Sequence, residues 1–544
     1  MSPDSNGHTG RPTRKEPTLN PPRHLLDRHG ARVLDPSSAV RTATQPQVRP
    51  TVYAGGQLLV RDCDLDTVRP LMAGVLERLR LQARYLPVDQ ELYRLAERHG
   101  LQELADKILL HRIALSNVDH EPSAPPDAWV VLQEYRAQFP KGDPTGDMVT
   151  LEHLLSGCDG TGFIAGNPFM QGGPFMQGGP FMEGGPFMQG GSVVAQYGLP
   201  GSGGRAPVKW LGDEPHRRPK KAMTTRRPVV AVFDTGAGEH PWLPDTIVDR
   251  EPDVLGLPLG LTDPATEPDD TGTLNNPLVA ELDSDAGHGT FICGIIRQLC
   301  PDANILAIRV MYSDGVVAEG NLLRAVNRLV FRQELARRLN QPELLVDVVS
   351  MSLGYYHESP SDVAFDHLLL APLRELGRRG VAVVASAGND SSSRHMYPAG
   401  FYPNKQGPVF AAEPDCVPVA SVGALNPDGE TIALFSNAGD WVSCHRIGVA
   451  VVSTMPTTFN ASLQPSARLT VPGEGIRSTM DPDDYKGGFA TWSGTSFAAP
   501  VLAGEIAKSL LSQGMLDDPD VSTAVNCGWQ AVGSLVKLDR PSQA

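Results

Sequence analysis

The sequence predicts an α/β fold in which a parallel β-sheet is covered by helices on both faces. Continuous apolar segments bounded by Gly, Asp and Pro recur at 229–233, 304–310, 346–353, 381–387 and 416–422. Long amphipathic segments separate several of them, notably 319–339 and 361–379. Strands that are apolar throughout are buried on both faces, and helices between them supply parallel crossovers.

Four polar residues lie at positions where folds of this class usually place their active sites. Asp234 and Asn389 follow two of the apolar segments, and active sites of open α/β sheets form beyond the carboxyl ends of the strands. His288 and Ser496 each precede an apolar stretch that is predicted to be a helix. A helix N-terminus offers N–H groups and the positive end of a dipole, which favours developing negative charge.

Three of these residues have neighbours too small to cover them. Asp234 lies in Val-Phe-Asp-Thr-Gly, His288 in Asp-Ala-Gly-His-Gly-Thr, and Ser496 in Ser-Gly-Thr-Ser-Phe-Ala-Ala-Pro. A serine hydroxyl becomes a nucleophile at neutral pH when a histidine removes its proton. A carboxylate then fixes the tautomer of that histidine and stabilises its charged form. The set therefore predicts acyl-transfer chemistry with an acid, a base and a nucleophile.

With these flanking residues, the chain order Asp234, His288, Ser496 resembles the subtilisin-like serine peptidases. Val-Ala-Ser-Ala-Gly-Asn-Asp at 384–390 resembles the segment that carries the family's oxyanion asparagine, here Asn389. The resemblance implies a subtilisin-like sheet. It also implies a serine endopeptidase that hydrolyses peptide bonds through an Asp-His-Ser triad and an Asn oxyanion hole.

The resemblance extends to substrate binding. Ser-Met-Ser-Leu-Gly at 350–354 is similar to the strand edge on which the family binds substrate as an added antiparallel strand. The implied substrate-binding residues are Ser352, Leu353, Gly354, Ser386, Ala387 and Gly388. This chemistry requires no cofactor and we predict no metal ligands. Calcium is a structural ion in many relatives, although no complete ligand set for it is legible.

Other interpretations of these motifs fit less well. Asp270 begins a second Asp-Thr-Gly, as in an aspartic peptidase, but it lacks a preceding apolar strand and lies in an acidic loop. Sedolisin-like peptidases share Ser-Gly-Thr-Ser but use Glu as the base and Asp near the oxyanion, whereas this chain has His288 and Asn389. The alternative that stays open is a catalytically silent subtilisin-fold module that binds peptides or proteins.

The amino-acid composition limits the classes of partner and the cellular compartments that fit this chain. The chain has 544 residues and a formal net charge of −15, so we expect protein or peptide substrates and no nucleic acid, whose phosphates require clustered Lys and Arg. Seven sparse cysteines fit a reducing compartment. The N-terminus lacks the apolar core of a secretory signal, and no segment approaches the roughly 20 apolar residues of a membrane span. We expect a cytoplasmic enzyme without membrane contact, with unconventional export left open.

Five segments are predicted along the chain. Residues 1–50 are rich in Pro and Arg and are expected to be a disordered tail, and 51–140 a small α+β domain. A flexible linker at 141–227, the peptidase domain at 228–515 and a C-terminal extension at 516–544 follow.

The small domain is expected to have a strand at 57–62, helices at 65–81 and 89–110, and a strand at 128–135. It stands where subtilisin-like precursors carry an inhibitory chaperone, but it shows no residue-level match to one. A propeptide-like role and an adaptor role therefore both stay open.

The linker contains Pro-Phe-Met four times at a six-residue period within 166–191, separated by Gln-Gly-Gly or Glu-Gly-Gly. Its composition predicts a spacer, and its evenly spaced apolar pairs support a second hypothesis, in which it binds within the chain's own cleft. The basic stretch 201–227 is expected to be a solvated connector. The acidic insertion 249–285 is expected to be a solvated loop, with a preference for basic substrates as the alternative. Residues 457–485 look like a further insertion.

Overall fold

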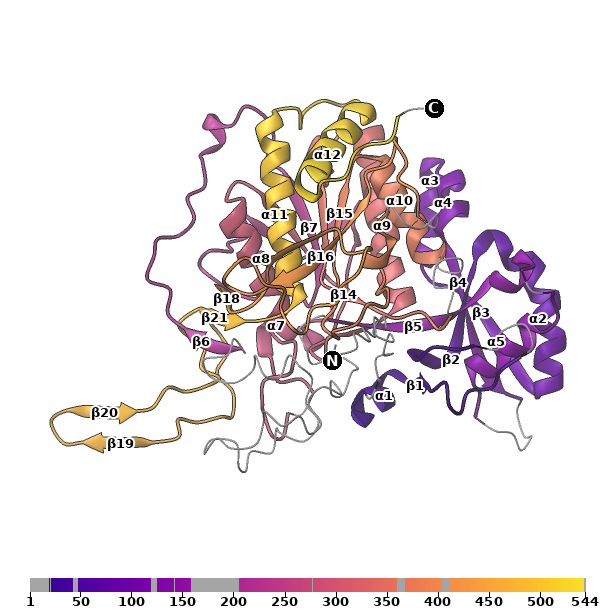
Figure 1. Cartoon of the computed structure of the whole chain (residues 1–544), viewed down its shortest axis with the longest axis horizontal. Helices are drawn as coiled ribbons and strands as arrows, with labels where there is room; N and C mark the ends of the chain where they lie inside the picture. Colours follow the sequence, from indigo (N-terminus) through magenta and orange to yellow (C-terminus); the bar gives the residue numbers. More distant parts are fainter. Residues whose placement is uncertain are drawn as a thin grey trace, which may run out of the picture.

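The structure is a computed structural model that describes residues 19, 21–42, 47–118, 125–140, 142–157, 205–275, 277–359, 367–403 and 410–542. A large α/β domain occupies the centre of the molecule (Figure 1). A smaller N-terminal domain, coloured indigo to purple, lies against one side of it, and strand β5 runs from the small domain towards the large one.

The core of the large domain is a seven-stranded parallel sheet in the order β17-β16-β15-β13-β7-β11-β8. Its strands are β7 (Val229–Asp234), β8 (Val248–Asp249), β11 (Asn304–Arg309), β13 (Val348–Met351), β15 (Ala382–Ser386), β16 (Val419–Leu425) and β17 (Cys444–Ile447). Five of these strands fall on the apolar segments recognised in the sequence. The predicted α/β fold with a parallel sheet is therefore confirmed.

Helices cover both faces of this sheet because successive strand residues point to opposite sides. Ala231 and Phe233 of β7 face one hydrophobic core, which contains α9 (Glu319–Arg338) and α10 (His367–Arg378). Val230 and Val232 face the other core. That second core contains α8 (His288–Leu299), α11 (Thr495–Gln513) and α12 (Val521–Val536). The C-terminal extension thus completes one helical layer.

The small domain contains an antiparallel sheet in the order β5-β2-β4-β3, with β1 paired to β2. Its elements are α1 (Arg23–His29), β1 (Ala31–Leu34), β2 (Thr51–Arg61), α2 (Leu65–Leu79), β3 (Leu81–Pro87), α3 (Gln90–His99), α4 (Gln102–Ile108), β4 (Leu110–Asn117), α5 (Ala128–Arg136) and β5 (Val149–Gly157). Side chains of α3 and α4 share the hydrophobic core that contains α9 and α10. The two domains are therefore packed through a common core.

The predicted strand at 128–135 is wrong, because this segment is helix α5. Asp127 caps the helix by accepting a hydrogen bond from the Trp129 backbone N–H at 3.0 Å. Buried Ala128, Val131, Leu132 and Tyr135 recur at spacings of three and four residues, which is the period of a helix. The apolar content of the segment concealed this period.

Two expectations for the segments around the small domain also need correction. Residues 23–34 are not part of a disordered tail, because α1 leads into β1, which pairs with β2 over four residues. Residues 149–157 are not linker but strand β5, buried along its whole length. Both segments are ordered because they pair with other strands, and local composition does not reveal those partners. The small domain therefore extends beyond residue 140.

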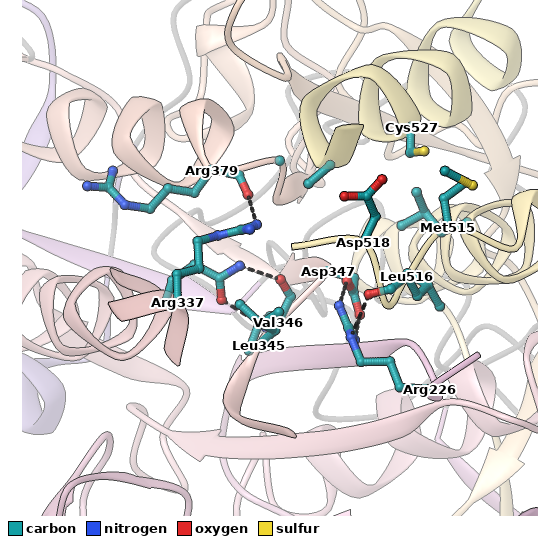
Figure 2. A pocket seen from close by; sticks show the side chains of 14 residues that line it. Arg226, Arg337, Leu345, Val346, Asp347, Arg379, Met515, Leu516, Asp518 and Cys527 are labelled. Carbon is teal, nitrogen blue, oxygen red and sulfur yellow. Dashed lines mark hydrogen bonds and ion pairs between the residues drawn. The ribbon is translucent and has the colours of Figure 1, made fainter. Parts of the chain in front are cut away.

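The described part of the basic stretch before β7 is exposed or half-buried, as expected of a solvated connector, and ion pairs also anchor it to the large domain. Arg226 makes a two-pronged contact with Asp347 at 2.6 and 2.7 Å, and Arg227 and Arg218 both bind Asp302. Figure 2 shows the Arg226 pair in a pocket that the C-terminal segment helps to line. This pocket lies at the amino ends of the parallel strands, opposite to Asp234.

The remaining elements are short. They are β6 (Ala206–Val208), β9 (Asp253–Val254), β10 (Leu257–Pro258), α7 (Pro268–Thr271), β12 (Val316–Ala318), β14 (Leu353–Gly354), β18 (Val451–Thr454), β19 (Arg468–Val471), β20 (Gly475–Ser478) and β21 (Phe489–Trp492). The hairpin β19–β20 lies in the predicted insertion 457–485 and projects away from the molecule (Figure 1). Among the described helices, none combines the length and apolarity needed to cross a bilayer.

Candidate active site

Asp234 and His288 are in direct contact at the carboxyl end of the sheet. Asp234 is the last residue of β7, and His288 is the first residue of α8. The His288 Nδ1 atom lies 2.7 Å from Asp234 Oδ1, and both side chains are buried. The same oxygen accepts a hydrogen bond from the Thr235 backbone N–H at 2.9 Å. These contacts orient the imidazole, with its Nε2 atom on the side away from Asp234.

Gly287 allows the chain to enter α8 at this point. Its φ is +83°, a left-handed conformation that side chains other than glycine rarely adopt. A Cβ there would also lie 2.5 Å from the sulfur of Met455. The glycine of the His motif is therefore required both by the backbone and by packing.

Asp269 holds this part of the site together, and the sequence did not single it out. Its buried carboxylate accepts hydrogen bonds from the Gly287 N–H at 3.0 Å, the Thr290 N–H at 3.0 Å and the hydroxyls of Thr290 and Thr235 at 2.5 and 2.8 Å. Burial raises the pKa of this carboxyl, and the four hydrogen bonds oppose the rise. Asp269 thereby ties the segment next to Asp234 to the segment that carries His288.

The acidic insertion is consequently not a solvated loop throughout. Asp269, Asp283 and Asp285 are buried, whereas Asp270 is exposed. Asp283 accepts hydrogen bonds from the backbone N–H groups of residues 274 and 275 at 2.7–3.2 Å. A run of acidic residues is typical of a solvated loop, and the sequence does not show which backbone N–H groups the fold places around each carboxylate.

Ser496 lies in the first turn of α11 and is buried. Its hydroxyl lies 3.3 Å from the backbone oxygen of Ser352, and the Ser352 hydroxyl donates to the backbone oxygen of Ser496 at 2.9 Å. The ring of Phe497, the next residue, lies 5.3 Å from the His288 ring, centroid to centroid. The start of α11 therefore faces the start of α8, and the serine is held against Ser352, the residue between β13 and β14.

Asn389 follows β15 and faces the same turn of α11. Its side-chain oxygen accepts hydrogen bonds from the Thr495 backbone N–H and hydroxyl, both at 2.9 Å. A backbone N–H can only donate, so the oxygen of the amide must face Thr495 and its NH₂ group must face the other way. The Thr495 hydroxyl also accepts from the Gly388 N–H at 3.1 Å. The orientation of Asn389 is thus determined by its neighbours.

The predicted substrate edge is paired with a strand of the chain itself. β5 lies antiparallel between β14, where Leu353 faces Gly157 and Gly354 faces Ser156, and β12. The Gly157 N–H donates to the backbone oxygen of Gly315 at 2.8 Å. The structure therefore shows a peptide strand added to the edge that the sequence assigned to substrate.

The other predicted substrate-binding residues continue the line from β15. Ser386 ends this strand, and the Ala387 N–H donates to the backbone oxygen of Val422 at 2.9 Å. Gly388 has a φ of +100°, and a Cβ there would lie 2.4 Å from the Asn437 amide nitrogen. Ser386, Ala387 and Gly388 therefore form a rigid backbone segment that leads to Asn389.

Gly157, the last described residue of β5, packs closely against a residue of the His motif. A Cβ on Gly157 would lie 2.7 Å from Asp285 Oδ1, and a Cβ on Gly315 would lie 2.4 Å from the same side chain. The Asp285 backbone oxygen accepts from the His288 N–H at 3.0 Å. The end of β5 is therefore next to the turn that carries His288. The Pro-Phe-Met repeats, and with them their predicted binding in the cleft, lie outside the described residues.

Cys293 in α8 is buried, and burial raises the pKa of its thiol. A protonated, enclosed thiol is a packing residue. All six cysteines in the described part of the chain are free.

Comparison with known proteins identifies the family. A model of the subtilase family matches residues 225–524 of this chain. The chain belongs to the subtilase family. Fervidolysin from Fervidobacterium pennivorans is 28% identical over 294 residues, which cover 51% of this chain and 34% of fervidolysin. An intracellular serine protease from Paenibacillus polymyxa is 27% identical over 293 residues, which cover 51% of this chain and 65% of that protease.

A subtilase-type proteinase from Saccharomyces cerevisiae is 24% identical over 233 residues, covering 42% of this subtilase and 37% of the yeast protein. The similarity therefore spans less than two thirds of each of these relatives. The crystal structure of fervidolysin aligns with a TM-score of 0.42 and 17% identity, covering 92% of this chain and 59% of that one. The match to the subtilase model confirms the predicted family.

Proposed function

We propose that this subtilase is a serine endopeptidase whose cleft lies between β12 and β14. The observation that carries the proposal is strand β5, a peptide of the chain itself that pairs with both cleft strands and ends beside the segments of His288 and Ser496. A surface that binds any peptide through its backbone is what a peptidase of broad sequence tolerance needs.

In the proposed mechanism Ser496 attacks the scissile carbonyl carbon while the Nε2 atom of His288 takes its proton. Asp234 holds Nδ1 of His288 through the 2.7 Å contact and stabilises the imidazolium that forms. His288 then gives the proton to the leaving amine as the peptide bond breaks. In the second step water attacks the acyl-enzyme while His288 takes its proton, and His288 returns that proton to Ser496 as the carboxylic acid leaves. The NH₂ group of Asn389, turned away from Thr495, donates to the oxyanion together with backbone N–H groups.

We propose further that the small domain acts as an internal inhibitor, the propeptide-like role, and not as an adaptor. It packs on α9 and α10 and places β5 in the cleft, so that a substrate strand and β5 compete for the same edge. Substrates are proteins or peptides, and the chemistry uses no cofactor and no nucleic acid. We place the enzyme in the cytoplasm on the basis of its sparse cysteines.

The test compares wild-type protein with Ser496→Ala and His288→Ala. Mass spectrometry of each purified chain detects self-cleavage, and a serine-directed fluorophosphonate detects the activated hydroxyl. We expect labelling and Ser496-dependent cleavage after β5 in the wild type and neither in the variants. Circular dichroism spectra that match the wild type establish that the variants are folded.

A folded wild-type chain that is neither labelled nor cleaved would overturn the proposal and favour the non-catalytic binding module. Equal cleavage in Ser496→Ala would assign the activity to another residue or to a contaminant. Self-cleavage is intramolecular, so occupation of the cleft by β5 does not hide it.

A further inference from the structure

His153, in the middle of β5, is buried between two carboxylates of the large domain. Its Nδ1 atom lies 2.8 Å from Oε2 of Glu319, and its Nε2 atom lies 2.9 Å from Oε2 of Glu358. The His153 backbone N–H also donates to Glu319, at 3.3 Å. Glu319 is the first residue of α9, directly after β12, and Glu358 follows β14. The contact therefore lies at the far end of the same cleft.

Two ionised carboxylates on its two ring nitrogens make His153 an imidazolium ion. An ionised carboxylate can only accept, so each ring nitrogen that faces one must carry a proton. Burial alone lowers the pKa of a histidine, but the hydrogen bonds and charges of Glu319 and Glu358 raise the pKa of His153 to about 10. His153 is surrounded by Glu319 on α9, by Tyr355, His357 and Glu358 after β14, and by Tyr53 on β2. Two further cations lie behind this layer: Arg136 on α5 contacts Glu358, and Arg394 donates to the His357 backbone oxygen.

The cluster does not suit a metal ion, although His153, His357 and Glu358 approach one another closely enough to share one. His357 Nδ1 accepts a hydrogen bond from the Ser359 N–H at 3.1 Å, so the neutral ring carries its proton on Nε2. Burial lowers the pKa of His357 to about 3, which keeps this ring neutral. Both histidines thus direct protonated nitrogens at Glu358. The cluster is built to hold a cationic side chain.

The described cationic side chains that contact Glu319 and Glu358 come from the small domain, and the two glutamates come from the large domain, whose own Arg394 donates to the backbone oxygen of His357. Arg136 of α5 contacts Oε1 of Glu358 at 3.4 Å, and His153 contacts both glutamates. Glu319 and Glu358 have side chains that are 2% and 0% exposed. When β5 leaves the cleft, both carboxylates lose the imidazolium of His153, and when the whole small domain leaves, Glu358 loses Arg136 as well. Such charges are costly unless another cation binds or water enters.

The register of β5 at this point is fixed by a second contact with α9. Glu152, the residue before His153, accepts a hydrogen bond from the Gly320 N–H at 3.3 Å at the beginning of the helix. Ala318 at the N-cap position provides no side-chain cap, so Glu152 supplies the missing acceptor. In this register, the residue that occupies the position of His153 faces Glu319 and Glu358.

We propose that Glu319 and Glu358 form a subsite of the cleft for a basic side chain, occupied in the full chain by His153. The subsite accepts the side chain four residues before the position of Gly157. It rests on the proposed function in taking the cleft between β12 and β14 as the substrate cleft. When His153 occupies the subsite, it holds β5 in place. When the subsite is empty, it favours peptides with Arg, Lys or protonated His at that position.

The first experiment measures hydrogen exchange of the β5 amides at pH 6 in the full Ser496→Ala chain, so that catalysis plays no part. His153→Leu leaves both buried carboxylates without the imidazolium, and we expect exchange of β5 to accelerate by roughly a hundredfold or more. The matched control is His111→Gln. His111 lies on β4 of the same domain and pairs with Asp62 within that domain at 3.2 Å, so its loss should leave β5 unchanged.

Removing the carboxylates separates charge from packing. In the triple variant His153→Leu, Glu319→Gln, Glu358→Gln, the acceleration should be much smaller than the sum of the separate effects, because the buried charges are gone. Fully additive effects, or an unchanged β5 in His153→Leu, would overturn the proposal. If His153→Leu does not fold, Glu319→Gln alone in the Ser496→Ala chain supplies the same test.

The second experiment measures binding of fluorescent nine-residue peptides to the Ser496→Ala, His153→Leu full chain by anisotropy. The peptides copy residues 149–157 with Arg, His or Leu at the place of His153. We expect the Arg peptide to bind at least about tenfold more tightly than the Leu peptide, and Glu319→Gln to abolish the difference. Equal affinities would overturn the subsite, whereas inactivity of the wild type would affect only the proposed peptidase function.

Discussion

Asp269→Asn tests whether a buried carboxylate positions two members of the proposed triad. Each oxygen of Asp269 faces one backbone N–H and one threonine hydroxyl. The hydroxyls of Thr235 and Thr290 are themselves acceptors of the N–H groups of Gly289 and Gly238, so their protons are committed to Asp269. An asparagine must turn its NH₂ group towards one of the two pairs of donors.

At least one backbone N–H, of Gly287 or Thr290, is then buried against another donor. A buried donor without an acceptor costs about 1–3 kcal/mol, and relief of the buried charge offsets part of this. We expect the free energy of unfolding to fall by about 2 kcal/mol. The displacement of His288 relative to Asp234 should lower kcat/KM by roughly ten- to a hundredfold.

Urea unfolding and peptide hydrolysis measure the two effects on the full chain. Asp270→Asn is the matched control, because it removes the neighbouring, exposed carboxylate. It should change the free energy of unfolding by less than about 0.5 kcal/mol. Equal stability and activity in the two variants would refute the positioning role of Asp269.

The remaining predictions concern the oxyanion, the docking of β5 and the linker. Asn389→Ala should lower kcat roughly a hundred- to a thousandfold with little change in KM, since it removes one of several oxyanion donors, and an unchanged kcat would remove Asn389 from that role. His153 titrates with a pKa raised from 6.5 to about 10, so its contribution to docking is complete below pH 6.5 and is lost as the pH rises through about 10. Hydrogen exchange of β5 in the Ser496→Ala chain should therefore accelerate across this window more steeply than in the same chain with His153→Gln, and parallel profiles would contradict this. Deletion of 168–189 should raise hydrolysis of a reporter peptide if the Pro-Phe-Met repeats compete for the cleft from a short tether, whereas an unchanged rate without Ser496-dependent fragments would leave them a spacer.

The sheet of the large domain was predictable because its strands are buried on both faces and its crossovers are helical. Both features leave continuous apolar runs and a period of 3.6 residues in the local sequence. The small domain was harder, because α5 is apolar enough to resemble a strand and β1 and β5 owe their order to the edges that they join. Edge pairing depends on a partner that no local window contains.

By itself the sequence determined the family and the candidate residues of the site, because Asp234, His288 and Ser496 stand in short motifs whose small neighbours resemble those of the subtilases. Only the tertiary structure decided which other residues support them. Asp269 and His153 look like ordinary polar residues until folding places their hydrogen-bond partners around them. Local sequence indicates backbone conformation and the period of the apolar residues. Hydrogen-bond and ion-pair partners come from segments far apart in the chain, so only the folded structure shows them.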